Sequence, residues 1–325
     1  MSTVSMSTNF PKVVASEMFN KVRGESALAK LCPEAPIAFT GTSVFTFSMD
    51  KELELVAENG AKGVGDGAAA PVNITPLKVV YNMRVSDEFL YAAEEHKLQI
   101  LDAFQTGFAR KLANALDLMF IHGVNPATNT VSASITNYFD TTVTNTVALS
   151  AASGKFNDGI VSAIALLTGY DANGILIGKN AAAGLYAETS TTNGKDFTAL
   201  GWGGANVNEI MGLRAAVSGN VDKAVKASAL ADAAKVDETI VGDFSAFRWG
   251  IAKELPIEVI RYGDPDGAGT DLARYNQVCL RGEAWIGAAI LDANAFARVT
   301  PYVESEGGGD AGGGAEGGGA EGGGT

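Results

Sequence analysis

The stretch from Leu77 to Pro126 decides the fold: LKVVYNMRVSDEFLYAAEEHKLQILDAFQTGFARKLANALDLMFIHGVNP. Its first part alternates apolar and polar residues, which predicts a strand, with apolar positions at Leu77, Val79, Tyr81, Met83 and Val85. Over residues 86–122 the apolar spacing becomes three or four residues, which predicts a helix, at Leu101, Phe104, Phe108, Leu112, Leu116 and Met119. The stretch from Leu98 to His122 would be roughly 37 Å long, and we expect the apolar face of this helix to pack on a sheet.

Another strand is predicted upstream, where Phe45, Phe47 and Met49 alternate with smaller or polar residues. Between the two strands lies ENGAKGVGDGAAAP (Glu58–Pro71), which is too long and too rich in glycine for a tight hairpin. We therefore expect residues 37–85 to form a long two-stranded ribbon with a flexible tip. An isolated ribbon is marginally stable in water, and no neighbouring segment of the chain is an obvious cover for its faces.

The two ends of the chain read as extensions. Residues 1–36 are predicted to form an arm with one short amphipathic helix between Lys12 and Leu31. Residues 306–325 read EGGGDAGGGAEGGGAEGGGT, which predicts a flexible acidic tether because glycine loses the most freedom on ordering. A GxGxxG pattern occurs in this tail, but no predicted strand precedes it, so it is not a nucleotide-binding loop.

The rest of the chain predicts a mixed α+β protein without a run of βαβ units. We expect strands in residues 128–150, a helix over 155–168, a buried strand at Ile175–Gly178, turns over 192–220, two strands over 239–262 and another strand region over 276–291.

Composition bounds the class of protein. The chain has 325 residues, 46 % of them apolar and 19 % charged, which predicts about two domains with a sizeable core. Its longest apolar run, Ile160 to Leu167, is shorter than the roughly 20 residues of a membrane-spanning helix. The start, MSTVSMSTNF, lacks the features of a secretory signal, so we expect folding in a reducing cytoplasm. In that setting Cys32 and Cys279 are expected to be small buried hydrophobes.

The net charge of the chain argues against sequence-specific binding of nucleic acid. Carboxylates outnumber Lys plus Arg by 37 to 24, which gives a formal net charge of −13. Because affinity for nucleic acid comes mainly from Lys and Arg, a sequence-reading DNA-binding protein is disfavoured.

Catalytic signatures are also missing. The chain has no GxSxG, HExxH or CxxC, and GILIGK (Gly174–Lys179) is one residue short of a phosphate-binding loop. The two histidines, His96 in a charged run and His122 at a helix end, favour a solvated face and a structural role. The acidic residues of DPDG (264–267) could hold a cation, but this sequence is typical of a turn. We expect no catalytic residue, cofactor or metal ion.

An uncovered ribbon, an uncovered arm and no active site together predict a building block whose extensions are buried by neighbouring copies. The order of these segments resembles the Hong Kong 97-type major capsid protein of tailed bacteriophages. The stretches that carry the resemblance are VSDEFLYAA (85–93) with HGVNPATNT (122–130), the region from Asn193 to Arg214, VGDFSAF (241–247) and VCLRGEAWIGAAILDANAFARV (278–299). Arg214 and Ala215 stand where that family often has Pro and Val.

The resemblance implies a capsid fold of four parts followed by a tail. They are an N-terminal arm (1–36), an extended β-hairpin E-loop (37–85), a peripheral domain with a long spine helix (86–150 and 256–302), an axial domain (151–255) and a glycine-rich tail (303–325).

It also implies partners and a location. Hexamers and pentamers of the chain would form an icosahedral virion shell around double-stranded DNA, assembled in the bacterial cytoplasm, with a portal and either a scaffold or a maturation protease. The acidic charge suits DNA that slides without sequence-specific binding. A decoration protein is a further implied partner, and no membrane is involved.

Charged residues of the ribbon are the predicted subunit contacts: Lys51, Glu52, Glu54, Glu58, Lys62 and Asp66. Some family members cross-link a ribbon lysine to a neighbour's asparagine, but we read Lys62 as an ordinary solvated lysine and expect a non-covalent shell. Two other functions stay open at this point: an encapsulin-type compartment shell that encloses enzyme cargo, and an enzyme with an unrecognised site.

Overall fold

The computed structural model describes residues 26–49, 51–87, 94–149, 155–190, 194–195, 209–254 and 257–301. Of the predicted arm helix, only α2 (Ala27–Leu31) falls within these ranges. The glycine-rich tail and most of the predicted turn region over 192–220 lie outside the described residues.

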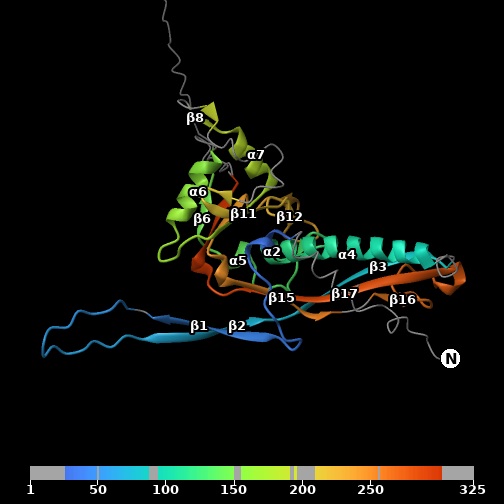
Figure 1. The fold of residues 1–325 in the computed structure, drawn as a ribbon, viewed down its shortest axis with the longest axis horizontal. Helices are drawn as coiled ribbons and strands as arrows, with labels where there is room; N and C mark the ends of the chain where they lie inside the picture. The colour runs from blue at the N-terminus through green and yellow to red at the C-terminus, as the bar shows by residue number, and fades with distance from the viewer. Residues whose placement is uncertain are drawn as a thin grey trace, which may run out of the picture.

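The long helix α4 spans Glu94–His122 and so lies within the predicted helical region 86–122. It runs along a sheet in which β17 is the central strand (Figure 1). The strands of this sheet are β15 (Phe247–Glu254), β17 (Gln277–Ile290), β16 (Glu258–Ile260) and β3 (Leu77–Ser86). The predicted packing of an apolar helix face on a sheet is therefore confirmed.

Close contact between α4 and this sheet depends on a glycine. Phe108 and Leu112 of α4 are buried, and a Cβ atom at Gly282 of β17 would lie 2.8 Å from the Phe108 ring. Any larger residue would push the helix away. The helix ends at Gly123, whose φ of +65° belongs to the left-handed region that glycine tolerates.

A six-stranded sheet forms the second half of the molecule, in the order β10-β11-β7-β14-β18-β6. Helices α6 and α7 lie beside it (Figure 1). The bounds are β10 (Glu209–Ile210), β11 (Leu213–Val217), β7 (Gly174–Ile177), β14 (Thr239–Gly242), β18 (Phe296–Thr300), β6 (Thr146–Ala148), α6 (Phe156–Ala165) and α7 (Lys179–Ala187).

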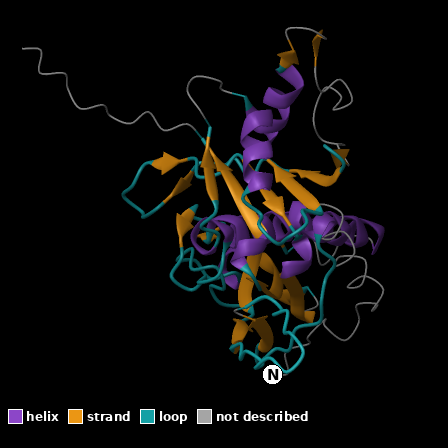
Figure 2. Cartoon of the chain, turned by 90° about the vertical axis from the view of Figure 1, so that its left-hand side faces the viewer, coloured by secondary structure: helices purple, strands orange, loops and turns teal. Residues whose placement is uncertain are grey.

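Short elements complete the chain. They are α5 (Phe139–Thr142), β4 (Val124–Asn125), β5 (Thr130–Val131), β12 (Val225–Lys226), β13 (Ala233–Ala234), β8 (Thr189–Ser190) and β9 (Gly194–Lys195). Seen from the ribbon end, strands pass through the middle of the molecule with helices to either side (Figure 2).

The largest core lies where α4 and the two sheets meet. Its centre is an aromatic cluster in which Phe139 contacts Phe244, Phe247 and Phe296, with ring centroids 5.1 to 6.5 Å apart. Trp249 is also fully buried, and its indole N–H donates to the carbonyl oxygen of Cys32 at 2.9 Å. Both cysteines are free and buried as predicted, and burial raises the pKa of Cys32 to about 11.

The ribbon exists, but its second strand was predicted wrongly. β1 (Thr42–Met49) pairs with β2 (Gly67–Ile74), from Thr42 opposite Ile74 to Met49 opposite Gly67. The strand that starts at Leu77 instead pairs with β17. The alanine-rich β2 shows no alternation because the ribbon buries neither face, so no face has to be apolar throughout.

Two further predictions need correction. ETIVGDFSAFRWGIA (238–252) is two strands rather than one, because a 3-10 turn at Phe244–Ala246 sends β14 and β15 into different sheets. Residues 128–150 hold the short helix α5 between brief strands. The strands predicted over 175–178 and 276–291 and the helix predicted over 155–168 are confirmed, within one or a few residues at their ends.

Candidate functional site

The ribbon formed by β1 and β2 carries an apolar face that nothing in the described chain covers. Phe45, Phe47 and Met49 project from one face of β1 and are 72, 68 and 77 % exposed. The ribbon extends well beyond the rest of the molecule (Figure 1). Large contiguous exposed apolar surfaces of this kind mark sites of interaction with another molecule.

The predicted contact residues gather on the segment that joins the two strands. All six side chains are exposed: Lys51, Glu52, Glu54, Glu58, Lys62 and Asp66. Two of them brace the segment, since Lys51 Nζ donates to the Val64 carbonyl at 2.9 Å and the Gly63 N–H donates to Glu54 Oε2 at 3.0 Å. Their contact with a neighbouring copy stays a prediction.

Sequence reasoning missed the apolar residues of the same segment. Leu53 and Leu55 are fully exposed, and Val64 is 79 % exposed. The alternation of Glu and Leu over residues 52–55 was the available signal, because an E-L-E-L pattern gives a strand one charged and one apolar face.

The base of the ribbon is held firmly by the body of the molecule. Ile37, which precedes β1, and Ile74, the last residue of β2, are buried together with Ala289 of β17. Gly41 turns the chain into β1 with a φ of +96°. The ribbon therefore leaves the body from a fixed point, and its direction is set by the core.

Asp117 forms a buried polar junction on α4. Its carboxylate accepts hydrogen bonds from the Ser26 hydroxyl at 2.5 Å and from the N–H groups of Ala27 and Leu28, which begin α2. It also accepts from the Asn220 side chain. Burial raises the pKa of Asp117, and these hydrogen bonds oppose the rise. One carboxylate thus joins α2, α4 and the turn after β11.

We expect Asp117→Ala to lower the free energy of unfolding by about 2–4 kcal/mol, because several buried donors lose their acceptor. Urea unfolding followed by tryptophan fluorescence measures this loss. Asp102→Ala is the matched control, since Asp102 lies on the same helix but is exposed, and it should change stability by less than about 0.5 kcal/mol. Equal effects of the two substitutions would contradict the assigned role.

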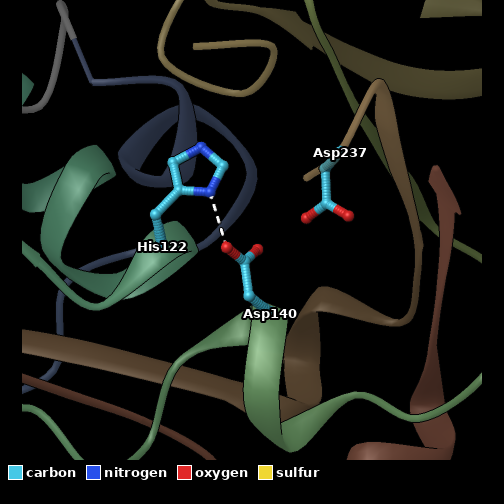
Figure 3. Close-up of side chains that lie close together, drawn as sticks. All are labelled: His122, Asp140 and Asp237. Atoms are coloured by element: carbon cyan, nitrogen blue, oxygen red, sulfur yellow. Dashed lines mark hydrogen bonds and ion pairs between the residues drawn. The ribbon is translucent and has the colours of Figure 1, made fainter. Parts of the chain in front are cut away.

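His122, Asp140 and Asp237 lie close together in the core (Figure 3), with ligand atoms all within 4.8 Å of one another. His122 Nδ1 is 2.8 Å from Asp140 Oδ2. The other ring nitrogen, Nε2, is 2.7 Å from the Asn220 carbonyl oxygen, so it must carry a proton. Both nitrogens of the imidazole are therefore already engaged.

Arg298 supplies the cation of this cluster. Its guanidinium lies 2.8 Å from Asp237 Oδ1 and 3.6 Å from Asp140 Oδ1. Burial, followed by the neighbouring Asp140 carboxylate, raises the pKa of Asp237 well above its ordinary value, while Arg298 lowers it. A metal ion here would face a guanidinium, so the geometry is that of a buried ion-pair network and not of a metal site.

The DPDG turn is likewise closed by an arginine. Arg84 of β3 donates to Asp264 Oδ1 at 2.7 Å and to both carboxylate oxygens of Asp266. Its hydrogen bond to Arg84 lowers the pKa of Asp266 well below the usual range. Asp264 also accepts from the N–H groups of Ala268 and Gly269. These contacts support the turn reading over the cation-binding alternative. The side chain of the other histidine, His96, lies outside the described residues.

None of the helices in the described ranges combines the length and apolar character needed to cross a bilayer. No curated protein matches the chain in sequence. A sequence model of the phage capsid family, in contrast, matches residues 10–300.

Solved structures agree with this match. A structure from Mycobacterium phage Ogopogo is 32 % identical, with a TM-score of 0.74 over 86 % of this chain and 92 % of that chain. One from Gordonia phage Cozz is 21 % identical, with a TM-score of 0.69 over 86 and 87 %. One titled as the capsid of a native GTA particle is 16 % identical, with a TM-score of 0.60 over 85 and 90 %.

These findings confirm the resemblance and the α+β capsid fold. They favour a phage shell subunit over an encapsulin-type compartment shell and over an enzyme. The chain belongs to the phage capsid family, and it is a structural, self-assembling subunit of the virion shell.

Proposed function

We propose that copies of this chain form the hexamers and pentamers of an icosahedral head that encloses double-stranded DNA. The observation that carries the proposal is the projecting ribbon, whose apolar face has no cover in the described chain. A two-stranded ribbon is marginally stable alone in water. In a closed shell, each ribbon would be covered by the next subunit.

The proposed division of the chain into domains follows from the resemblance. We propose an arm (1–36), an E-loop (37–85), a peripheral domain (86–150 and 256–302), an axial domain (151–255) and a tail (303–325). The pairing of β3 with β17 supports an E-loop whose free hairpin is only β1 and β2. Lys51, Glu52, Glu54, Glu58, Lys62 and Asp66 would set the register against the neighbour. Exposed ion pairs contribute only about 0–1 kcal/mol each, so apolar contacts would supply the stability.

The acidic charge supports a container that does not hold its DNA tightly. With a formal net charge of −13, the subunit would repel phosphates and let the polymer slide during packaging. The remaining partners are a portal, a scaffold or maturation protease, and a decoration protein, with assembly in the cytoplasm of the bacterial host.

Negative-stain electron microscopy of the purified chain tests the proposal. We expect closed, hollow particles with regular hexameric and pentameric units, formed above a threshold concentration. Boiling these particles in SDS should release single subunits, because we expect no covalent cross-links. A compact monomer at every concentration, with both extensions resistant to protease, would overturn the proposal.

A further inference from the structure

The two acids of the buried cluster, Asp140 and Asp237, face each other inside the molecule. Figure 3 shows the Asp237 carboxyl on the side of Asp140 that lies away from His122. Asp237 is fully buried, and the side chain of Asp140 is only 10 % exposed. One oxygen of each carboxyl, Asp140 Oδ1 and Asp237 Oδ2, is buried and has no hydrogen-bond donor among the described residues. Buried polar atoms without a partner are rare in native proteins and need an explanation.

The other oxygen of each carboxyl already has a partner. Asp140 Oδ2 lies 2.8 Å from His122 Nδ1, and Asp237 Oδ1 accepts a hydrogen bond from the Arg298 guanidinium at 2.8 Å. Arg298 approaches Asp140 Oδ1 only to 3.6 Å, which is beyond hydrogen-bond distance. The two oxygen atoms without a donor are therefore left to each other.

A proton between the two acids would satisfy both of these atoms. A protonated carboxyl is a donor as well as an acceptor, and when two acids share a buried site the pKa of one of them is strongly raised. The pKa of Asp237 is raised first by burial and then by the charge of Asp140, and a hydrogen bond between the two acids acts in the same direction. Arg298 opposes the rise.

The charge of the cluster makes this proton removable. His122 and Asp140 are neutral as a pair when a proton lies between them. With Asp237 protonated, the cluster therefore carries the single positive charge of Arg298. Loss of the Asp237 proton makes the cluster neutral, but it leaves two buried oxygen atoms facing each other with nothing between them, so contact between the two acids becomes repulsive.

Other charged groups nearby have partners of their own. Glu238, the next residue along the chain, pairs with Lys235 at 3.4 Å. Asp222, whose charge acts on Glu238, accepts a hydrogen bond from the N–H group of Asn180 at 2.7 Å. The charged groups with the largest effect on Asp237 are therefore the facing acid on α5 and the arginine on β18.

We propose that one proton, shared between Asp237 Oδ2 and Asp140 Oδ1, holds α5 against the six-stranded sheet, and that loss of this proton as the pH rises loosens that contact. Asp140 lies on α5, whereas Asp237 lies two residues before β14 begins. Arg298 of β18 joins the same two parts, because its Nε donates to the Val143 carbonyl just after α5. All of these groups belong to one chain, so the inference does not depend on assembly.

Asp237→Asn distinguishes a shared proton from an ordinary ion pair by the sign of its effect. Asparagine can donate to Asp140 and accept from Arg298, as a protonated aspartate does. We expect the urea midpoint of the variant at neutral pH to equal or exceed that of the wild type. An ionised Asp237 would instead make the variant clearly less stable, because the buried ion pair with Arg298 would be lost, and that result would overturn the inference.

Hydrogen exchange at several pH values tests the contact itself. The folded chain holds a proton that the opened state releases, so the opening equilibrium should rise about tenfold per pH unit above the unfolded pKa of about 3.9. The rise should end at the folded-state pKa of Asp237. We expect this dependence, after correction for intrinsic exchange rates, in peptides that cover Phe139–Val143 of the wild type and not of Asp237→Asn.

Glu238→Gln is the matched control for the exchange experiment. Glu238 is also buried and its pKa is also raised by burial, but its partner is Lys235 and not another acid. This variant should keep the pH dependence of the wild type in the α5 peptides. A wild-type α5 whose opening does not change with pH, or an equal loss of the dependence in Glu238→Gln and Asp237→Asn, would overturn the inference.

If Asp237→Asn fails to fold, carbon-13 NMR of the wild-type chain labelled at its aspartate carboxyl carbons decides. A shared proton makes the signals of two carboxyls change together with pH, whereas a buried acid without a facing acid, such as Asp117, changes alone. Absence of such a pair would overturn the inference. A chain that shows the shared proton but forms no particles would overturn the proposed function and leave this inference standing.

Discussion

Replacement of Arg298 by methionine is expected to lower the free energy of unfolding by about 3–5 kcal/mol, the usual cost of removing one partner from a buried ion pair. Arg298 is only 7 % exposed. Its guanidinium contacts Asp237 and Asp140, and its Nε donates to the Val143 carbonyl at 3.1 Å. Methionine fills much of the same space, but it leaves the two carboxylates without their cation.

The matched control is Lys78→Met. Lys78 pairs with Glu283 at 2.9 Å, but its side chain is 45 % exposed, and exposed pairs are worth about 0–1 kcal/mol. Chemical denaturation of both variants measures the difference. A loss of less than about 1 kcal/mol in Arg298→Met would show that the network is hydrated and not buried.

The loss caused by Arg298→Met should also depend on pH. The pKa of Asp237 is raised in the folded chain. Protonation of Asp237 therefore contributes its full stabilisation at pH values below the unfolded-state pKa of about 3.9. This contribution is lost as the pH rises through the folded-state pKa. Because Arg298 lowers that pKa, its removal raises it further. The deficit of the variant should therefore be smaller at pH 5 than at pH 8, and a deficit that is constant with pH would contradict this assignment.

Replacement of both Phe45 and Phe47 by aspartate is expected to abolish particle formation while leaving the subunit folded. Burial of one phenylalanine contributes about 1.5–3 kcal/mol, so loss of two weakens each contact by at least about a hundredfold. In a shell every contact is repeated, so the effect multiplies across the particle. Both side chains are exposed in the single subunit, so the free energy of unfolding should change little.

Thr46→Asp combined with Ser48→Asp provides the control for this variant. It adds the same two charges to the same strand, but on its opposite face. Electron microscopy and size-exclusion chromatography should find particles in the control and only small species in the phenylalanine variant. Particles from both variants would show that the apolar face of β1 is not buried in the shell.

Local patterns predicted most of the long elements. The helix around Phe108 and Leu112 was found because burial of one face leaves a period in the sequence. The strand at Ile175 was found as a short run of apolar residues, because it is buried on both faces. Helix α7 was missed because KNAAAGLYA is rich in alanine and glycine and carries a weak apolar pattern. The short strand β18 is rich in apolar residues, but nothing in its local sequence indicates that it pairs with β14.

The buried polar contacts could not be predicted from the sequence, and the reason is physical. Asp117 meets Ser26 across 91 positions, and Arg298 meets Asp237 across 61. A buried aspartate looks like an exposed one until its partners are known. The same holds for the DPDG turn, whose cation comes from Arg84 on another strand.

The sequence by itself determined that an alternating apolar strand precedes a glycine-rich tip and that a long helix must pack on a sheet, because these features depend on residues a few positions apart. It also determined the family, through several short motifs in a set order. Only the tertiary structure decided that β1 pairs with β2 and that β3 pairs with β17. Strand pairing joins backbone groups that every residue carries, so the choice of partner depends on which faces the whole fold can bury.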